Sequence, residues 1–255
     1  MWVDHHQNTT FKTKDAQLDY ETSRLNSNRT LIYDGKYPAG AKLLWDHLGA
    51  HSSDPARYAE MVRWATITDS AGYENCDQAV FGDQPALRIA QTLGTAIDPE
   101  RLKAILQALR NGTIDEVAAL PIVAKPFSLL RPRIEAGLDI ISKHLKVSDD
   151  GMIASYETTV TSTDVLPRYG SFYLFPNIKY AVSLVHGDRG SKISASRNPW
   201  GPPTAARIGT IMETYGGGGH DEVGSYQLPL GNIDKSRTIF HQILLNLATA
   251  ETTKD

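Results

Sequence analysis

The chain opens with the stretch Trp2-Val3-Asp4-His5-His6, from which both the fold and the chemistry are predicted. Two apolar residues run directly into one carboxylate and two imidazoles. We expect a short strand that carries these polar side chains to one edge of a parallel sheet, because ligands bind at the carboxyl ends of parallel strands. Aspartate and neutral imidazole together favour Mn²⁺ or Zn²⁺ over Ca²⁺. By itself the motif is a weak metal signal, since pairs of histidines are common.

A second stretch of unusual composition lies far downstream, where Tyr215 is followed by four glycines at positions 216 to 219 and then by His220. Glycines allow a positive φ and the close approach of a ligand to the backbone. Successive N–H groups in such a turn can form an anion-binding nest, and His220 can add a donor or a positive charge. A tight helix-to-strand turn without a ligand is the alternative. Four glycines followed by histidine exceed what a turn needs, so we favour anion binding.

These two stretches, in this order and at this separation, resemble the motifs of the DHH superfamily of phosphoesterases over nearly the whole chain. Members carry an Asp-His-His metal domain followed by a smaller DHH-associated domain with a Gly-Gly-Gly-His motif. The resemblance implies the fold class α/β, with a partial parallel-sheet DHH domain at 1–125, a linker helix at 126–148 and a smaller α/β substrate-binding domain at 149–255. Only three residues precede Asp4, so the Asp-x-Asp strand that members place upstream has no counterpart here.

The resemblance also implies a set of metal and catalytic residues. His5 and Asp69 would be metal ligands for Mn²⁺ or another divalent ion, His6 would lie close to the metal or the scissile phosphate, and Asp4 would orient the imidazoles. Asp69 follows a short β-branched run and is expected at a strand end or tight turn; a turn or capping Asp is the alternative. Since a two-metal centre needs several carboxylates around ions about 3.5–4 Å apart, we expect weak or absent two-metal occupancy.

For substrate binding, the resemblance points to Arg197 together with Gly217, Gly218, Gly219 and His220. Arg197 belongs to a basic cluster, and an arginine can bind phosphate through two parallel hydrogen bonds. The other members of the cluster are Arg189, Lys192 and Arg207, of which Arg189 and Arg207 are expected to be surface charges. Members usually continue with His-x-x-Ala-Ala-Gly, whereas this chain has two acids after the histidine.

Composition narrows the class of protein. The 255 residues are 41% hydrophobic, which allows one large domain or two small ones with real cores. A net charge of −3 gives no general footprint for duplex nucleic acid. One cysteine, Cys76, excludes a disulfide framework and fits a reducing compartment. We find no signal peptide and no apolar run long enough to span a membrane. We therefore expect a cytoplasmic protein without membrane contact.

The helix and strand pattern follows the proposed division. Helices are expected at 39–49, from 55 onward, and at 84–93, 98–110, 114–120, 127–146, 203–215 and 233–248, two of them opened by the Asp-Pro pairs at 54–55 and 98–99. Strands are expected at 152–156, 180–185, 191–196 and 223–228. Residues 7–38 are expected to be mostly loop with a short apolar piece at 31–33.

Three hypotheses remain open from the sequence. The first is a metal-dependent phosphoesterase acting on a short oligonucleotide, a nucleotide phosphate or polyphosphate, with a small phosphorylated molecule or a single-stranded nucleic-acid end as its partner. The second is a non-catalytic module that binds a nucleotide or a nucleic-acid end. The third treats Met1 as an internal methionine, so that the given chain is a truncated remnant. A homodimer is left open in each case.

Overall fold

The structure is a computed structural model that describes residues 2–5, 31–95 and 98–252. It divides into two compact units. Unit 1 comprises Met1–Glu74 and Phe81–Arg131, and unit 2 comprises Asn75–Val80 and Pro132–Asp255. The division near residue 131 falls inside the segment expected to be a linker helix. None of the described helices is both long enough and apolar enough to cross a bilayer.

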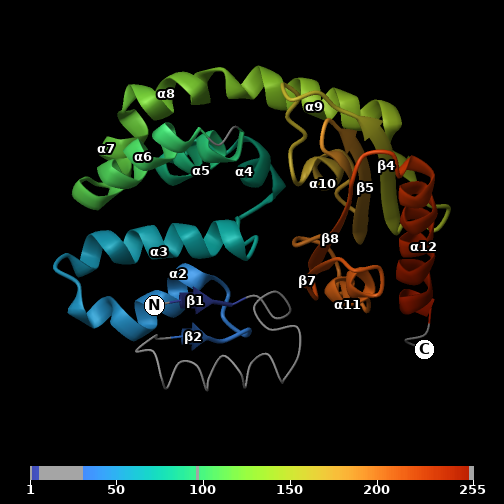
Figure 1. Cartoon of the computed structure of the whole chain (residues 1–255), viewed down its shortest axis with the longest axis horizontal. Coiled ribbons are helices and arrows are strands. Elements are labelled where there is room, and N and C mark those ends of the chain that lie inside the picture. Colours follow the sequence, from blue (N-terminus) through green and yellow to red (C-terminus); the bar gives the residue numbers. More distant parts are fainter. Residues whose placement is uncertain (1, 6–30, 96–97, 253–255) are drawn as a thin grey trace. The chain divides into compact units, whose positions relative to one another are not determined.

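Unit 1 begins with a pair of short parallel strands, β1 (Trp2–Asp4) and β2 (Leu31–Tyr33), in which Asp4 lies opposite Tyr33. The first was expected as a strand, and the second coincides with the apolar piece at 31–33. Because the strands are parallel, the residues that follow them, His5 and Asp34, emerge at the same edge. Helix α2 (Gly40–Leu48) packs against this pair (Figure 1).

The remainder of unit 1 is helical. Asp54 accepts from the N–H of Arg57, and Asp98 accepts from that of Glu100, so both Asp-Pro helix starts are confirmed. The core of these helices is made of buried aliphatic residues such as Ile105, Val117 and Val123. The elements that follow α2 are η1 (Gly49–His51), α3 (Pro55–Asp69), α4 (Cys76–Phe81, mostly assigned to unit 2), α5 (Pro85–Thr95), α6 (Pro99–Asn111), α7 (Ile114–Ala119) and α8 (Pro121–Ser128).

Of the two positions expected for Asp69, the strand end is wrong, because α3 runs without interruption to that residue. A tight turn does follow it directly. The β-branched threonines are accommodated inside the helix: the hydroxyl of Thr66 donates to the carbonyl oxygen of Val62, four residues earlier. The helix then ends abruptly. Ala71 adopts a left-handed φ of 57°, and the N–H of Gly72 donates to the carbonyl oxygen of Ile67. Asp69 therefore occupies the final turn of a helix.

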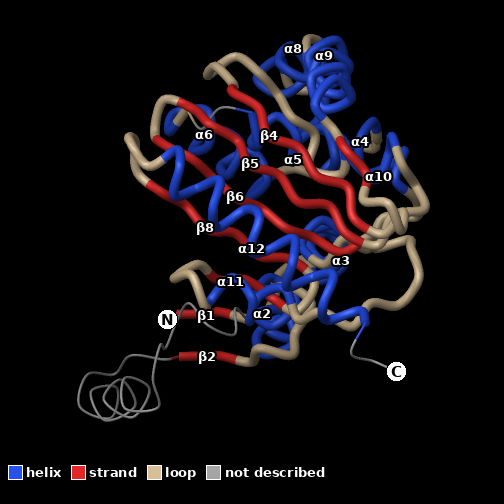
Figure 2. The backbone as a smooth tube through the Cα atoms, turned by 90° about the vertical axis from the view of Figure 1, so that its right-hand side faces the viewer, coloured by secondary structure: helices blue, strands red, loops and turns tan. Residues whose placement is uncertain are grey.

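Unit 2 is built on a six-stranded sheet in the order β3-β4-β5-β6-β8-β7, and Figure 2 shows β4, β5, β6 and β8 side by side. Strands β4 and β5 are parallel, and the other neighbouring pairs are antiparallel. The four strands expected from the sequence are confirmed as β4, β5, β6 and β8. The bounds are β3 (Lys146–Val147), β4 (Ile153–Thr159), β5 (Tyr180–Gly187), β6 (Gly190–Arg197), β7 (Gly218–His220) and β8 (Val223–Leu228).

The two faces of this sheet differ in chemistry, because successive side chains alternate between them. One face, called the α12 face, carries the main core with α11 (Ile208–Glu213) and α12 (Ile233–Thr252); its buried residues include Tyr180, Leu184, Ile193, Met212 and Ile243. Figure 1 shows α12 running along this side of the sheet. The opposite face, called the serine face, carries Ser183, Ser194 and Ser225 at directly opposed positions.

Two of the helices expected in unit 2 have other bounds, and the short helices α4 and α10 were missed. The helix expected at 127–146 begins later, as α9 (Leu130–His144), and α11 is shorter than the expected 203–215. A glycine and two prolines at 201–203 keep the chain before α11 out of a helix. The short helix α10 (Gly170–Leu174) was not expected, because five residues carry too little periodicity to detect.

The carboxylate of Glu251 joins the end of α12 to the sheet. It accepts hydrogen bonds from the Lys179 ammonium, the Tyr180 hydroxyl and the backbone N–H of Ala205. Only 7% of its side chain is exposed. Burial alone would raise the pKa of this carboxyl, but the three donors outweigh that effect and lower it to about 2. The contact therefore stabilises the folded state as long as the group is ionised.

We predict that Glu251→Gln lowers the free energy of unfolding at pH 7 by about 2–3 kcal/mol, because a buried charged hydrogen-bond network loses its acceptor charge. The folded pKa lies below the ordinary value of 4.5, so the contribution is complete above pH 4.5 and is lost as the pH falls toward 2. Urea unfolding between pH 2 and 7 measures both effects. Asp149→Asn, at an exposed turn of the same unit, is the control. An unchanged pH slope in Glu251→Gln would contradict the assignment.

Candidate functional site

The imidazole of His5 is held between two oxygen atoms from different parts of unit 1. Its Nδ1 lies 3.0 Å from the carbonyl oxygen of Tyr37, and its Nε2 lies 3.1 Å from Oδ2 of Asp69. His5 is buried, whereas the side chain of Asp69 is 47% exposed. The structure thus brings together the two residues expected to be metal ligands, although they lie far apart in the sequence.

The hydrogen-bonding directions at His5 bear on what this pair can hold. A carbonyl oxygen can only accept, so Nδ1 must carry the proton that is shared with Tyr37. In a neutral imidazole the lone pair of Nε2 then faces the carboxylate of Asp69, and two acceptor atoms lie 3.1 Å apart. Such a contact is stable when a cation lies between or beside the atoms, either a proton on Nε2 or a metal ion that both atoms ligate.

The separation fits a metal ion. Two neighbouring ligands at about 2.1–2.2 Å from an ion, roughly 90° apart, are about 3 Å from each other, as Nε2 and Oδ2 are here. Nitrogen and carboxylate oxygen are ligands suited to Mn²⁺ and Zn²⁺. Within residues 2–5, 31–95 and 98–252 no group of three or more His, Cys, Asp or Glu side chains is placed to hold a metal. The described part of the chain therefore offers two of the ligands that a metal ion would need.

Two acids add negative potential at the same strand edge. Burial, and then the negative charges of Asp4 and Asp34, raise the pKa of Tyr33. The N–H of Asp34 donates to the carbonyl oxygen of Asp4, which holds the ends of β1 and β2 together. Asp34 was missed in the sequence, although an acid directly after an apolar strand is the signal that could have found it.

His6, expected to be catalytic, lies outside the described residues.

The glycine stretch forms a compact loop between α11 and β7. Gly216 has a φ of 89°, and a Cβ on Gly219 would lie 2.1 Å from the carbonyl oxygen of Val223. A Cβ on Gly217 would lie 2.4 Å from the carbonyl oxygen of Ser225, whereas one on Gly218 would meet nothing within 4 Å. The glycines at 216, 217 and 219 are thus needed for the turn and the tight β7–β8 pairing, while Gly218 faces open space.

That open space is a cavity of about 570 Å³ on the serine face. Gly218 and Gly219 line it, and its floor is the row of hydroxyls formed by Ser183, Ser194 and Ser225. Lys192 and Arg168 supply positive charge at its wall, against the single carboxylate of Asp164. The cavity therefore offers hydroxyl donors, backbone groups and two cations, a set that suits a phosphorylated ligand of modest size.

Arg197 does not line the cavity that Gly218 and Gly219 line. Its guanidinium lies 3.3 Å from Glu222. Alternation along β6 also directs it to the other face from Ser194 and Ser196. Arg207 pairs in a similar way with Asp221. The two acids that depart from the family pattern thus neutralise two of the four clustered basic residues, and Lys192 is the member that reaches the cavity.

His220 follows the glycines at the end of β7, opposite Val223. Since Val223 also lies opposite Ser196 of β6, alternation places His220 on the serine face of the sheet. The substrate-binding role of His220, like that of Arg197, stays a prediction. The serine row itself was missed, and the signal for it was the alternation of Ser194 and Ser196 within a half-buried strand.

Comparison with known proteins identifies solved structures with a similar fold. A scan against protein-family models and a search of the curated proteins find no match. Among solved structures, the chain is similar to a pGpG-specific phosphodiesterase, PggH, from Vibrio cholerae, with a TM-score of 0.61, 22% identity and coverage of 84% of this chain and 76% of that one. It is also similar to the DHH domain of a member of a family of ribosomal proteins, with a TM-score of 0.54, 15% identity and coverage of 96% and 63%.

An exopolyphosphatase-related protein from Bacteroides fragilis matches more distantly, with a TM-score of 0.49, 15% identity and coverage of 85% of this chain and 59% of that one. The chain thus spans between about three fifths and three quarters of the length of these three structures. The α/β fold expected from the DHH resemblance is confirmed: the chain has the fold of a DHH-domain protein.

We predict that Gly219→Ala destabilises unit 2, lowering the free energy of unfolding by about 2 kcal/mol or more, because the new Cβ would overlap the backbone of β8. Gly218→Ala in the same loop is the matched control and should leave stability within about 1 kcal/mol, because its Cβ enters open space. Thermal and urea unfolding of the two variants measure the difference. Equal stability of the two variants would show that the loop is not closed as described.

Proposed function

We propose that this protein is a metal-dependent phosphoesterase that hydrolyses a small phosphodiester or phosphoanhydride. The observation that carries the proposal is the pair of acceptor atoms on His5 and Asp69, which lie 3.1 Å apart beside the carboxyl ends of two parallel strands. The DHH-type fold supports the same activity. The cavity on the serine face of unit 2 supplies a place for a phosphorylated substrate.

In this proposal His5 and Asp69 hold a divalent ion such as Mn²⁺. The ion, when bound, supplies a hydroxide nucleophile and neutralises charge on the phosphoryl oxygens. The Tyr37 carbonyl fixes the His5 tautomer, so that Nε2 is presented as a ligand. Asp4 adds negative charge at the strand edge, and His6 lies next to the ligand His5 in the sequence. Further ligands would have to come from outside the described residues or from a second chain.

For the substrate we propose a short linear nucleotide with a terminal phosphate. The cavity volume of about 570 Å³ is in the range for small ligands rather than for a long strand. Its serine hydroxyls can bind phosphate or ribose oxygens, and Lys192 and Arg168 can neutralise phosphate charge. The fold similarity to a pGpG-specific phosphodiesterase supports a dinucleotide such as pGpG as the first compound to test.

The test is hydrolysis of pGpG by the full chain with Mn²⁺, followed by chromatography. Attack of one water on the internal phosphodiester yields two molecules of GMP, so the two products are indistinguishable and the yield of GMP is twice the pGpG consumed. We expect hydrolysis that requires Mn²⁺ and that falls at least about a hundredfold in Asp69→Asn. Polyphosphate, tested in parallel, distinguishes a phosphoanhydride from a phosphodiester specificity. No hydrolysis of either compound would contradict the proposal.

Metal binding gives a test that needs no substrate. We predict that His5→Ala and Asp69→Asn each weaken Mn²⁺ binding at least about tenfold in titration calorimetry, since each removes one of the two proposed ligands among the described residues. His47→Ala is the matched control, because His47 lies on α2, where its Nδ1 bonds to the backbone of Leu43. Mn²⁺ affinity that is the same in His5→Ala, Asp69→Asn and the control would overturn the assignment of this site.

A non-catalytic binding module is the second candidate. It is favoured by one observation, that the described residues supply only two metal ligands. A module of this kind would bind pGpG through the cavity of unit 2 and release it unchanged with or without Mn²⁺. Binding without turnover would therefore select this function over the phosphoesterase.

Residues of the substrate cavity have their own predicted effect. We expect Lys192→Gln to weaken pGpG binding about tenfold without a change in Mn²⁺ affinity, because it removes a cation from the cavity wall. The same measurement on Arg197→Ala tests the substrate role expected from the family resemblance. Arg189→Gln, at the exposed β5–β6 turn, is the control. If Lys192→Gln binds pGpG as the control does, the ligand does not occupy this cavity.

A further inference from the structure

A second cavity, of about 740 Å³, lies at the β4 edge of the unit 2 sheet, toward the α12 face. We call it the α12 cavity. Its side chains come from α9, β3, β4, β5 and α12. None of these residues is in the glycine loop. Among the described residues, only Tyr156 lines both this cavity and the one on the serine face. The polar side chains that bear on its chemistry are Lys143, His144, Lys146, Glu157, Arg237 and His241.

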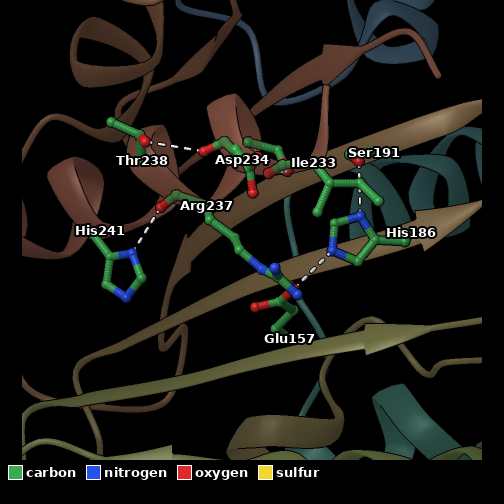
Figure 3. A network of polar contacts seen from close by, with 9 residues as sticks. Glu157, His186, Ser191, Ile233, Asp234, Arg237, Thr238 and His241 are labelled. Atoms are coloured by element: carbon green, nitrogen blue, oxygen red, sulfur yellow. Dashed lines mark hydrogen bonds and ion pairs between the residues drawn. The ribbon is translucent and has the colours of Figure 1, made fainter. Parts of the chain in front are cut away.

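The charge of this lining is strongly one-sided. Three cationic side chains and three imidazoles line the cavity with a single carboxylate, that of Glu157. One of the cations, Lys143, is paired with Asp139 outside the lining, so Lys146 and Arg237 are the cations left for a ligand. Glu157 is already engaged: its Oε1 accepts from Nε2 of His186 at 2.9 Å and from Nε of Arg237 at 2.7 Å (Figure 3). Burial would raise the pKa of Glu157, but these two donors outweigh it and hold the pKa below its ordinary value. The carboxylate therefore stays ionised and compensated, and the remaining charge of the cavity is positive.

His186 is held by contacts at both ring nitrogens. A carboxylate only accepts, so Nε2 carries a proton and donates to Glu157, while Nδ1 lies 2.7 Å from the hydroxyl oxygen of Ser191. Ser191 is buried and does not line the cavity. The contacts that link Ser191, His186 and Glu157 therefore fix the position of the Arg237 guanidinium. They offer no accessible nucleophile.

Several donors remain available to a ligand. Arg237 donates from Nε to Glu157, and within residues 2–5, 31–95 and 98–252 its two terminal nitrogens make no hydrogen bond and Lys146 makes no ion pair. His144 and His241 each place Nδ1 against a helix carbonyl oxygen, at 2.8 and 2.7 Å, which leaves Nε2 of each ring directed away from its own helix backbone. Figure 3 shows this arrangement for His241 beside Arg237.

The sheet edge adds backbone groups. Strand β3 pairs only with Ala154 and Ser155, so among the described strands none lies against the outer edge of Glu157 and Thr159. The N–H of Val160 donates to the carbonyl oxygen of His186 in β5, so by alternation the N–H groups of Glu157 and Thr159 point away from β5, to the open edge. The cavity is lined by all five residues from 155 to 159, as expected where an unpaired strand edge forms its wall.

An apolar wall completes the cavity. Phe240 and Leu244, one turn apart on α12, line it together with Ile233. A phosphate group alone would make no use of this surface, whereas a ligand that joins a phosphate to a flat or apolar ring would use both parts. The volume of about 740 Å³ accommodates a molecule of mononucleotide size.

We propose that the α12 cavity is a second ligand-binding site that takes a phosphorylated small molecule with an apolar or aromatic ring, such as a nucleoside diphosphate. Lys146 and the terminal nitrogens of Arg237 bind the phosphates, and the ring packs against Phe240 and Leu244. This site is independent of the proposed phosphoesterase activity. Its ligand would bind on the far side of the sheet from the serine row.

The test is equilibrium dialysis of ADP with the full chain, without divalent metal. We expect Lys146→Glu to raise the dissociation constant of ADP at least about tenfold, because a phosphate-binding cation becomes a carboxylate. Lys235→Glu is the matched control: it makes the same change of charge on α12 outside the cavity lining. Lys192→Gln, in the serine-face cavity, should leave ADP binding at this site unchanged.

A second measurement needs no variant. Titration of the wild-type chain with ADP or with inorganic pyrophosphate should shift the imidazole NMR signals of His144 and His241, and adenosine should shift them less at equal concentration. The proposal is overturned if neither probe binds, if ADP binds without moving these signals, or if Lys146→Glu and Lys235→Glu weaken ADP equally. Loss of ADP binding in Lys192→Gln alone would assign ADP to the other cavity and would also overturn it.

Discussion

Unit 1 depends on one imidazole that must satisfy two acceptors. His5 follows β1, is oriented by the Tyr37 carbonyl in the loop after β2, and meets Asp69 at the end of α3. A buried ring with a carbonyl on one side and a carboxylate on the other is stable only when a cation completes the arrangement. The same contact thus ties three segments of unit 1 together and marks the position of the proposed metal ion.

The end of α3 shows how the backbone is arranged to serve that contact. A left-handed alanine two residues beyond Asp69 is unfavourable by about 1 kcal/mol relative to glycine, yet Ala71 adopts this conformation and stops the helix there. If the helix continued, Asp69 would be an interior residue of a longer rod. Because it stops, the half-exposed carboxylate of Asp69 stands at the helix terminus, where its Oδ2 reaches His5.

Much of this could be predicted from the sequence, for identifiable reasons. Strands β1 and β8 and helices α2, α6 and α12 carry strong local signals, such as the proline after Asp98 at the start of α6. The pairing of His5 with Asp69 came from a family resemblance, since no local pattern joins positions so far apart. The helical state of Asp69 was misjudged because β-branched residues favour strands, whereas the hydroxyls of Thr66 and Thr68 here bond back into α3. The position of Arg197 could not be foreseen, because its ion pair with Glu222 forms between residues far apart in the sequence.

The sheet of unit 2 shows why one element can serve two chemistries. Alternation sends Ser194 and Lys192 to one face and Ile193 and Ala195 to the other, so a polar floor and a packed core share the same backbone. The serine hydroxyls of the polar floor are neutral, so no charged partner is needed on the core side of the sheet. At the edge, where β3 stops short of Glu157, the core side gives way to charged groups as well, and burial there must be balanced by pairing. Arg237 and His186 provide that pairing, and this is why a strand that is apolar at Ile153 can end in a basic cavity only four residues later.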